Sequence, residues 1–264
     1  MNCFHFGEPA KQLFGAYHAA HPSRDRREGL VLCNPIGQEY MRAHRAILEL
    51  ANRLSGCGFH VLRFDYFATG DSHGASIDGS ISQWTGDIAA AVEELRDYAG
   101  ISRISLAGMR LGATLAAIAA ENLAIEKLAL WDVVINGKQY LSEVIDMHDA
   151  WLKDLLHRPP PEIRHSENLQ VLGFPFSASF CREIEQIDLM QRHNPSAKKT
   201  LIINNAKRSE IDALQKHFEN NGALCQAEMI TGARVWRKES GYSSVLMPNE
   251  ALNTIVEWLQ KDDK

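Results

Sequence analysis

The segment with the clearest chemical pattern is Gly108-Met109-Arg110-Leu111-Gly112, which follows an apolar run and precedes a stretch rich in small residues. A strand, a tight turn and a helix in this order match the pattern Gly-x-Ser-x-Gly. In that pattern the glycines permit the turn, and the central side chain projects from a strained backbone. Arg110 occupies the central position. Because a guanidinium stays protonated and is not nucleophilic, an acyl-enzyme on residue 110 is excluded.

Strand-like and helix-like segments alternate around this turn. Helical spacing of apolar residues occurs at 40–54 and 88–98, and 249–260 has the stripe of a final amphipathic helix. The short apolar runs typical of strands lie at 30–33, 59–64, 104–107, 127–131, 200–204 and 224–230. This alternation predicts an α/β fold with a mainly parallel central sheet and helices on both faces.

The chain is expected to form a single domain over 1–264. Its 264 residues, 45% of them hydrophobic, suffice for one substantial core. The longest interval without a strand signal is about 136–196, which contains a helical pattern at 140–156 and three prolines at 159–161. This interval has little apolar content of its own, so we expect a helical lid inserted over the sheet.

Composition narrows the classes of partner. The net charge of -5 gives no broad reason to expect nucleic acid or an anionic membrane. No segment approaches the roughly 20 apolar residues that span a bilayer, and the first residues lack the features of a secretory signal, so we expect a cytoplasmic protein. The spacing of His148, His157 and His165 matches no standard metal signature. We expect no metal and no cofactor.

Further motifs follow the predicted strands. Arg63-Phe64-Asp65-Tyr66 with Gly70-Asp71-Ser72 follows the second run, and Leu130-Trp131-Asp132 ends the fourth. With the arginine-bearing turn, these motifs make the chain resemble the serine aminopeptidase-like branch of the α/β-hydrolases. It is especially similar to bacterial exosortase A system-associated hydrolases. The resemblance covers nearly the whole chain and implies an α/β-hydrolase fold, with a setting in bacterial exopolysaccharide or lipid-linked biosynthesis.

The resemblance also shows which catalytic residues are missing. In this family the base histidine comes from the loop after the last strand, yet no histidine follows His217. The usual acid position, just after 200–204, is occupied by 205–209, which includes Lys207 and Arg208. Asp132 lies where some relatives supply the acid instead. A chain without a Ser-His-Asp triad is therefore predicted.

Arg110 permits two interpretations. At a helix N-terminus it could line a pocket for a carboxylate, a phosphate or a similar group. Alternatively, a carboxylate of the protein itself, such as Asp132 or Glu39, forms a structural pair with it. A buried unpaired guanidinium would be too costly, so an inward-pointing Arg110 needs one of these partners. With no histidine to orient, Asp132 is expected to pair with Arg110 or to cap the chain that follows.

The candidate site residues surround the turn. Gly37, Gln38 and Glu39 lie in the loop where the resemblance places an oxyanion-hole amide. The other candidate ligand-binding residues are Met109 and Arg110 at the turn, Asp132, and the loop residues Tyr66 and Tyr242. His44 could act as a displaced base or be an ordinary surface histidine.

Three hypotheses of function follow. The leading one is a degenerate hydrolase that binds a small anionic or acyl-bearing molecule, or a protein partner, in the cleft over Arg110. The enzyme alternative is an ester or thioester hydrolase or acyltransferase, with Arg110 as an anion or oxyanion clamp and activation from His44 or a bound water. The third is a scaffold whose lid surface docks another protein.

Overall fold

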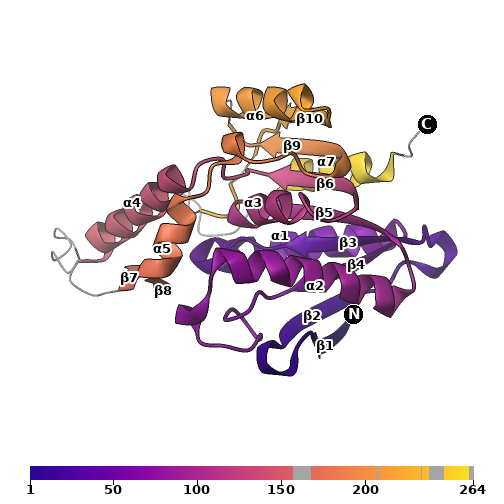
Figure 1. The fold of residues 1–264 in the computed structure, drawn as a ribbon, viewed down its shortest axis with the longest axis horizontal. Helices are drawn as coiled ribbons and strands as arrows, with labels where there is room; N and C mark the ends of the chain where they lie inside the picture. Colours follow the sequence, from indigo (N-terminus) through magenta and orange to yellow (C-terminus); the bar gives the residue numbers. More distant parts are fainter. Residues whose placement is uncertain (157–167, 207, 233, 238–246, 262–264) are drawn as a thin grey trace.

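A computed structural model describes residues 1–156, 168–206, 208–232, 234–237 and 247–261. Its centre is an eight-stranded sheet with the strand order β1-β2-β4-β3-β5-β6-β9-β10 (Figure 1). The six strands from β4 to β10 in this order are parallel to one another. They coincide with the predicted apolar runs and are β3 (Glu28–Cys33), β4 (Phe59–Phe64), β5 (Arg103–Met109), β6 (Ile125–Trp131), β9 (Ala197–Asn204) and β10 (Leu224–Met229).

An antiparallel hairpin of β1 (Asn2–Phe6) and β2 (Leu13–His18) extends the sheet beyond β4. Sequence patterning did not identify this hairpin. Most of β1 is exposed at the edge of the sheet, so it lacks the continuous apolar run that marks a buried parallel strand.

Helices cover both faces of the sheet (Figure 1). On one face α1 (Gly37–Gly56) and α7 (Asn249–Gln260) pack together, and the other face carries α2 (Ile81–Ala99), α3 (Leu111–Ala119) and α6 (Ser209–Asn220). Side chains alternate along β3, since Leu30 and Leu32 join the core beneath α1 whereas Val31 and Cys33 join the core beneath α2. The predicted fold class, with a mainly parallel sheet between two helical layers, is confirmed.

The segment between β6 and β9 extends away from the sheet (Figure 1). It begins with α4 (Gly137–Leu156), which contains the helical pattern predicted at 140–156. A hairpin of β7 (Asn168–Val171) and β8 (Phe174–Ser177) follows, and then α5 (Ala178–Glu185). These later elements were not predicted because each has only four or eight residues, too few for a clear periodicity. Short 3-10 helices complete the described chain at η1 (Pro9–Lys11), η2 (Pro22–Arg24), η3 (Ser76–Asp78) and η4 (Leu189–Gln191).

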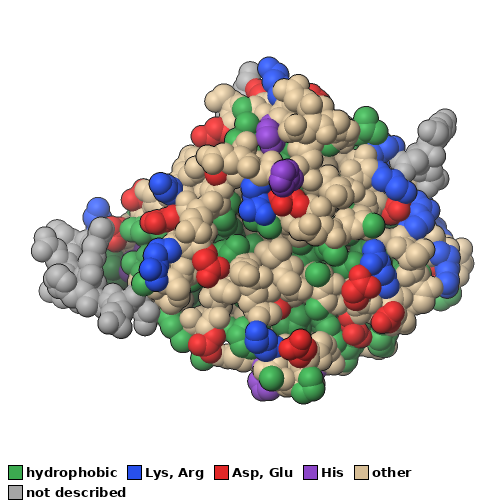
Figure 2. Space-filling model, in the orientation of Figure 1, with side chains coloured by type: hydrophobic (Ala, Val, Ile, Leu, Met, Phe, Trp, Pro, Cys, Tyr) green, Lys and Arg blue, Asp and Glu red, His purple; other side chains and the backbone are tan. Residues whose placement is uncertain are grey.

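The surface carries mixed charge. Figure 2 shows basic, acidic and hydrophobic side chains interspersed on the face that it presents. None of the described helices combines the length and apolarity needed to cross a bilayer. Within the described ranges, no three His, Cys, Asp or Glu side chains gather in a way that could hold a metal ion.

Candidate functional site

Arg110 lies in the sharp turn between β5 and α3. Its φ of 55° and ψ of -127° place a non-glycine residue in a strained region of backbone space. The turn is tight because the backbones around it touch. A Cβ atom on Gly108 would lie 2.6 Å from Ala113 Cα, and one on Gly112 would lie 2.2 Å from the carbonyl oxygen of Asn34. Both positions therefore require glycine, as the sequence pattern predicts.

The side chain of Arg110 is only 1% exposed and is held by acidic groups. Its Nε donates to Glu39 Oε1 at 2.8 Å, and its Nη2 donates to Glu143 Oε2 at 2.8 Å. Tyr140 Oη donates to the other oxygen of Glu39 at 3.0 Å. We call Glu39, Arg110, Tyr140 and Glu143 the arginine cluster. The hypothesis of a structural pair is confirmed for Glu39.

The arginine cluster holds two carboxylates and one guanidinium. Burial raises the pKa of Glu39, although Arg110 and the Tyr140 hydroxyl both stabilise its carboxylate. Burial works against the charged form of Arg110, but Glu39 and Glu143 outweigh it and hold the pKa of Arg110 above its ordinary value. Arg110 thus stays charged, and its guanidinium is paired with two carboxylates of the protein itself.

Trp236 connects Arg110 with Asp132. The Arg110 guanidinium lies over the indole ring, 3.8 Å from its centre, and the indole Nε1 donates to Asp132 Oδ2 at 2.9 Å. The other oxygen of Asp132 accepts from the backbone amide of Asn205 at 2.9 Å. Burial raises the pKa of Asp132, which these two donors oppose. Asp132 forms no ion pair with Arg110 among the described residues, and its two hydrogen-bond donors are Trp236 and Asn205, which follows β9. Both expected roles of Asp132, pairing with Arg110 and capping the chain that follows it, are therefore wrong.

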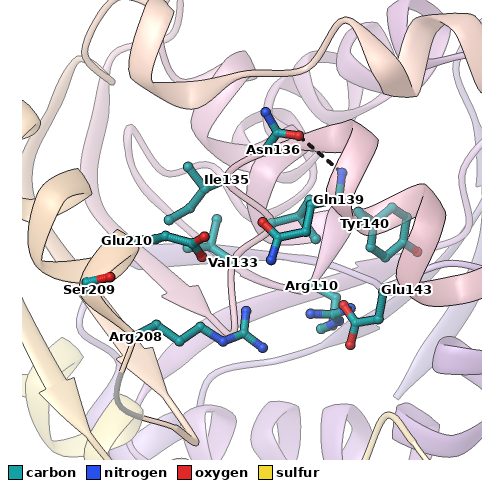
Figure 3. A pocket seen from close by; sticks show the side chains of 11 residues that line it. Arg110, Val133, Ile135, Asn136, Gln139, Tyr140, Glu143, Arg208, Ser209 and Glu210 are labelled. Carbon is teal, nitrogen blue, oxygen red and sulfur yellow. Dashed lines mark hydrogen bonds and ion pairs between the residues drawn. The ribbon is translucent and has the colours of Figure 1, made fainter.

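Two cavities flank the arginine cluster. The first, of about 500 Å³, lies between the start of α4 and the start of α6 (Figure 3). We call it the polar cavity. Its charged lining consists of Arg110, Glu143, Arg208 and Glu210, and Figure 3 shows the Arg208 side chain pointing toward Arg110 and Glu143.

The second cavity, of about 640 Å³, lies between α4, the start of α1 and Trp236. We call it the apolar cavity. Its apolar lining is Met147, Ala150, Trp151, Leu172 and Trp236. Polar and charged side chains also line it: Gln38, Glu39, Arg42, Asp154 and Arg237.

Only some of the predicted site residues line one of the two cavities. Gln38 and Glu39 line the apolar cavity, and Arg110 lines the polar one. Gly37 starts α1 with a φ of 54° and faces the Phe174 ring. Several predicted residues line neither of these cavities. They are Gly37, the buried Tyr66, Met109 and Asp132, and His44, which is exposed on α1. Tyr242 lies outside the described residues.

Sequence patterning missed several residues of the site. Tyr140, Glu143 and Met147 lie three and four positions apart on α4, so their helical spacing places them on one face. That spacing could have indicated a shared surface but not which side chain it meets. No motif marks Trp236 as a site residue, and Arg208 stands out in the sequence only as a departure from the family's usual acid loop.

Comparison with known proteins identifies the fold. No protein-family model matches the chain, and no curated protein sequence matches it. The ferulic acid complex of Est1E from Butyrivibrio proteoclasticus superposes with a TM-score of 0.67 at 16% identity, covering 97% of this chain and 96% of that one. Proline iminopeptidase from Mycobacterium smegmatis gives 0.65 at 12% identity, with 98% and 97% covered.

A third similar structure is XC6422 from Xanthomonas campestris, described as an α/β serine hydrolase without a lid. Its TM-score is 0.60 at 15% identity, with 99% of this chain and 96% of that one covered. At such identities the likeness establishes the fold alone. The chain has the α/β-hydrolase fold.

Proposed function

The chain has the α/β-hydrolase fold, but we propose that it has no working Ser-His-Asp triad. We propose further that it binds a small acyl-bearing anion in the apolar cavity. The observation that carries the proposal is the position of Arg110, which fills the nucleophile position and is buried among the protein's own acids. The resemblance to exosortase-associated hydrolases suggests acylated precursors of bacterial exopolysaccharide or lipid-linked synthesis as the setting.

The surroundings of Trp236 support the absence of a triad. In a Ser-His-Asp triad the histidine hydrogen-bonds to the acid on one side and the nucleophile on the other. Here Trp236 donates to Asp132 and lies against Arg110. Trp236 therefore occupies the bridging place of a base, but an indole has no acceptor nitrogen and cannot take a proton from a nucleophile.

The apolar cavity supports binding of an acyl group. Its volume of about 640 Å³ falls within the range of about 300–1,000 Å³ that small-molecule sites occupy. Met147, Trp151 and Trp236 offer apolar surface for a hydrocarbon chain. Arg42 and Arg237 offer guanidinium groups to an anionic end, and neither forms an ion pair with another described residue.

The enzyme alternative finds less support in this geometry. An oxyanion clamp needs donors aimed at the reacting atom, whereas the Nε and Nη2 donors of Arg110 are directed at Glu39 and Glu143. His44, the proposed displaced base, is exposed and lines neither of the two cavities.

Titration calorimetry with decanoate tests the proposal, with decanol as the uncharged control ligand. Decanoate should bind saturably and more tightly than decanol. Arg42→Ala should weaken decanoate binding roughly tenfold, because it removes a hydrogen bond to a charged group. The matched control is Arg45→Ala, an exposed arginine on the same helix that does not line the cavity. Absence of saturable binding, or equal losses from both substitutions, would overturn the proposal.

A further inference from the structure

We infer that the polar cavity is a second binding site, for a small oxyanion such as a carboxylate or a phosphate. Arg208 and Arg110 hold the oxyanion, and Glu143 occupies the Arg110 half of the site until the ligand displaces it. This site is separate from the apolar cavity and does not depend on the acyl ligand proposed above.

Arg208 supplies one half of the site. Its side chain is half-buried, lines the polar cavity and points toward Arg110 (Figure 3). Within the described ranges it forms no ion pair or hydrogen bond through its side chain. The nearby carboxylate of Asp132 already accepts from Asn205 and Trp236. A half-buried guanidinium that lines a cavity and donates to no described acceptor has free donors for a carboxylate or a phosphate.

Glu143 is the replaceable member of the arginine cluster. Its side chain is 28% exposed, whereas that of Glu39 is 4% exposed and cannot leave without opening the core. Glu143 Oε2 accepts from Arg110 at 2.8 Å, and both residues line the polar cavity. Glu143 therefore lies where an incoming oxyanion would bind, and its partly exposed side chain can move into solvent.

Displacement of Glu143 would give Arg208 a direct acceptor. Glu39 and Glu143 are both paired with Arg110, whereas Arg208 forms no ion pair with a described residue and only acts at longer range on Asp132. An oxyanion between the two guanidinium groups keeps Arg110 paired and gives Arg208 an acceptor. Glu143 then moves into water, where a free carboxylate is well solvated. Because Glu143 belongs to α4, binding in the polar cavity would also loosen the hold of the cluster on that helix.

Nuclear magnetic resonance of the Arg110 Nε–H group tests the inference, because this group reports directly on its acceptors. The probe ligands are inorganic phosphate in one titration and acetate in another. Glu143→Gln should tighten binding roughly tenfold, because it removes the competing carboxylate. Arg208→Ala should weaken binding roughly tenfold by the same rule. The matched control is Glu210→Gln, a cavity glutamate with no described bond to Arg110, which should change the affinity by less than about threefold.

Saturable shifts of the Arg110 Nε–H resonance with phosphate alone would identify a phosphate-type ligand. Saturable shifts with both phosphate and acetate would show that the site also binds carboxylates. Three results would overturn the inference. The first is unchanged or weaker binding in Glu143→Gln, and the second is unchanged binding in Arg208→Ala. The third is an equal gain of affinity in Glu143→Gln and Glu210→Gln, which would show that the effect comes only from the change in net charge. Arg208 is half-buried and outside the core, so its variant remains informative even if Glu143→Gln unfolds.

Discussion

The indole of Trp236 lies against the guanidinium of Arg110, with 3.8 Å from the guanidinium carbon to the ring centre. A desolvated stack of this kind stabilises by about 2 kcal/mol. The same indole donates to Asp132. Trp236 thus joins the turn residue to an acid at the end of β6, which is the spatial relationship that a catalytic histidine would have.

Rebuilding a triad at these positions should create activity. In the triple variant Arg110→Ser/Glu39→Gln/Trp236→His, the new imidazole would lie between the introduced serine hydroxyl and the Asp132 carboxylate. Glu39→Gln is included because it prevents a buried glutamate from being left without its arginine. General-base catalysis contributes about 10²–10⁴-fold, so hydrolysis of p-nitrophenyl acetate should rise at least roughly 10²-fold over the wild type.

The matched control for this experiment is Arg110→Ser/Glu39→Gln, which keeps Trp236. It should hydrolyse the ester no faster than the wild type, because a hydroxyl without a neighbouring base is a weak nucleophile. Equal rates in the double and triple variants would show that Trp236 does not stand in the place of a base.

Removal of the guanidinium should destabilise the fold. Arg110→Met leaves Glu39 buried without its ion pair, and such a loss costs about 3–5 kcal/mol of unfolding free energy. The double variant Arg110→Met/Glu39→Gln should recover at least about 1 kcal/mol of that loss, because the remaining buried group is neutral. Urea denaturation measures both values. A double variant less stable than Arg110→Met would contradict the view that the buried charge causes the loss.

The sequence was sufficient for the parallel sheet because its inner strands have buried apolar runs, as in β3 and β5. It was also sufficient for the turn, since Gly108 and Gly112 are required by backbone contacts that recur with this geometry. The partners of Arg110 were harder to predict. The sequence indicates Glu39 as a candidate, but Glu143 reaches the guanidinium from α4, and no local pattern shows how that helix is placed over the sheet.

Close backbone packing at the turn predicts a sharp difference between two glycines. Gly112→Ala should lower the melting temperature strongly, since its Cβ would lie 2.2 Å from the Asn34 carbonyl oxygen and 2.4 Å from that of Cys33. Gly86→Ala, within α2, is the control, because no heavy atom lies within 4 Å of its added Cβ. This control should gain about 0.5–1 kcal/mol from helix propensity. Similar melting temperatures for the two variants would contradict the packing of the turn.

His18 should make stability depend on pH. Burial, with Arg63 beside it, lowers the pKa of His18 to about 4 from 6.5, and the Arg63 Nε donates to His18 Nε2 at 3.2 Å. Below pH 6.5 the unfolded chain therefore binds a proton at His18 that the folded protein does not bind, so the contribution of His18 to the unfolding free energy falls as the pH drops from 6.5 to 4. His18→Gln should reduce this fall. Denaturation curves of both proteins at several pH values measure it, and parallel pH dependences would refute the assignment.

The central claim is binding without serine chemistry, and one mass-spectrometric measurement tests it most directly. The folded protein is incubated with decanoate and a serine-reactive fluorophosphonate, then examined by native mass spectrometry. We predict a non-covalent complex with decanoate and no covalent fluorophosphonate adduct. Stoichiometric covalent labelling of a serine, or the absence of any decanoate complex, would contradict the account.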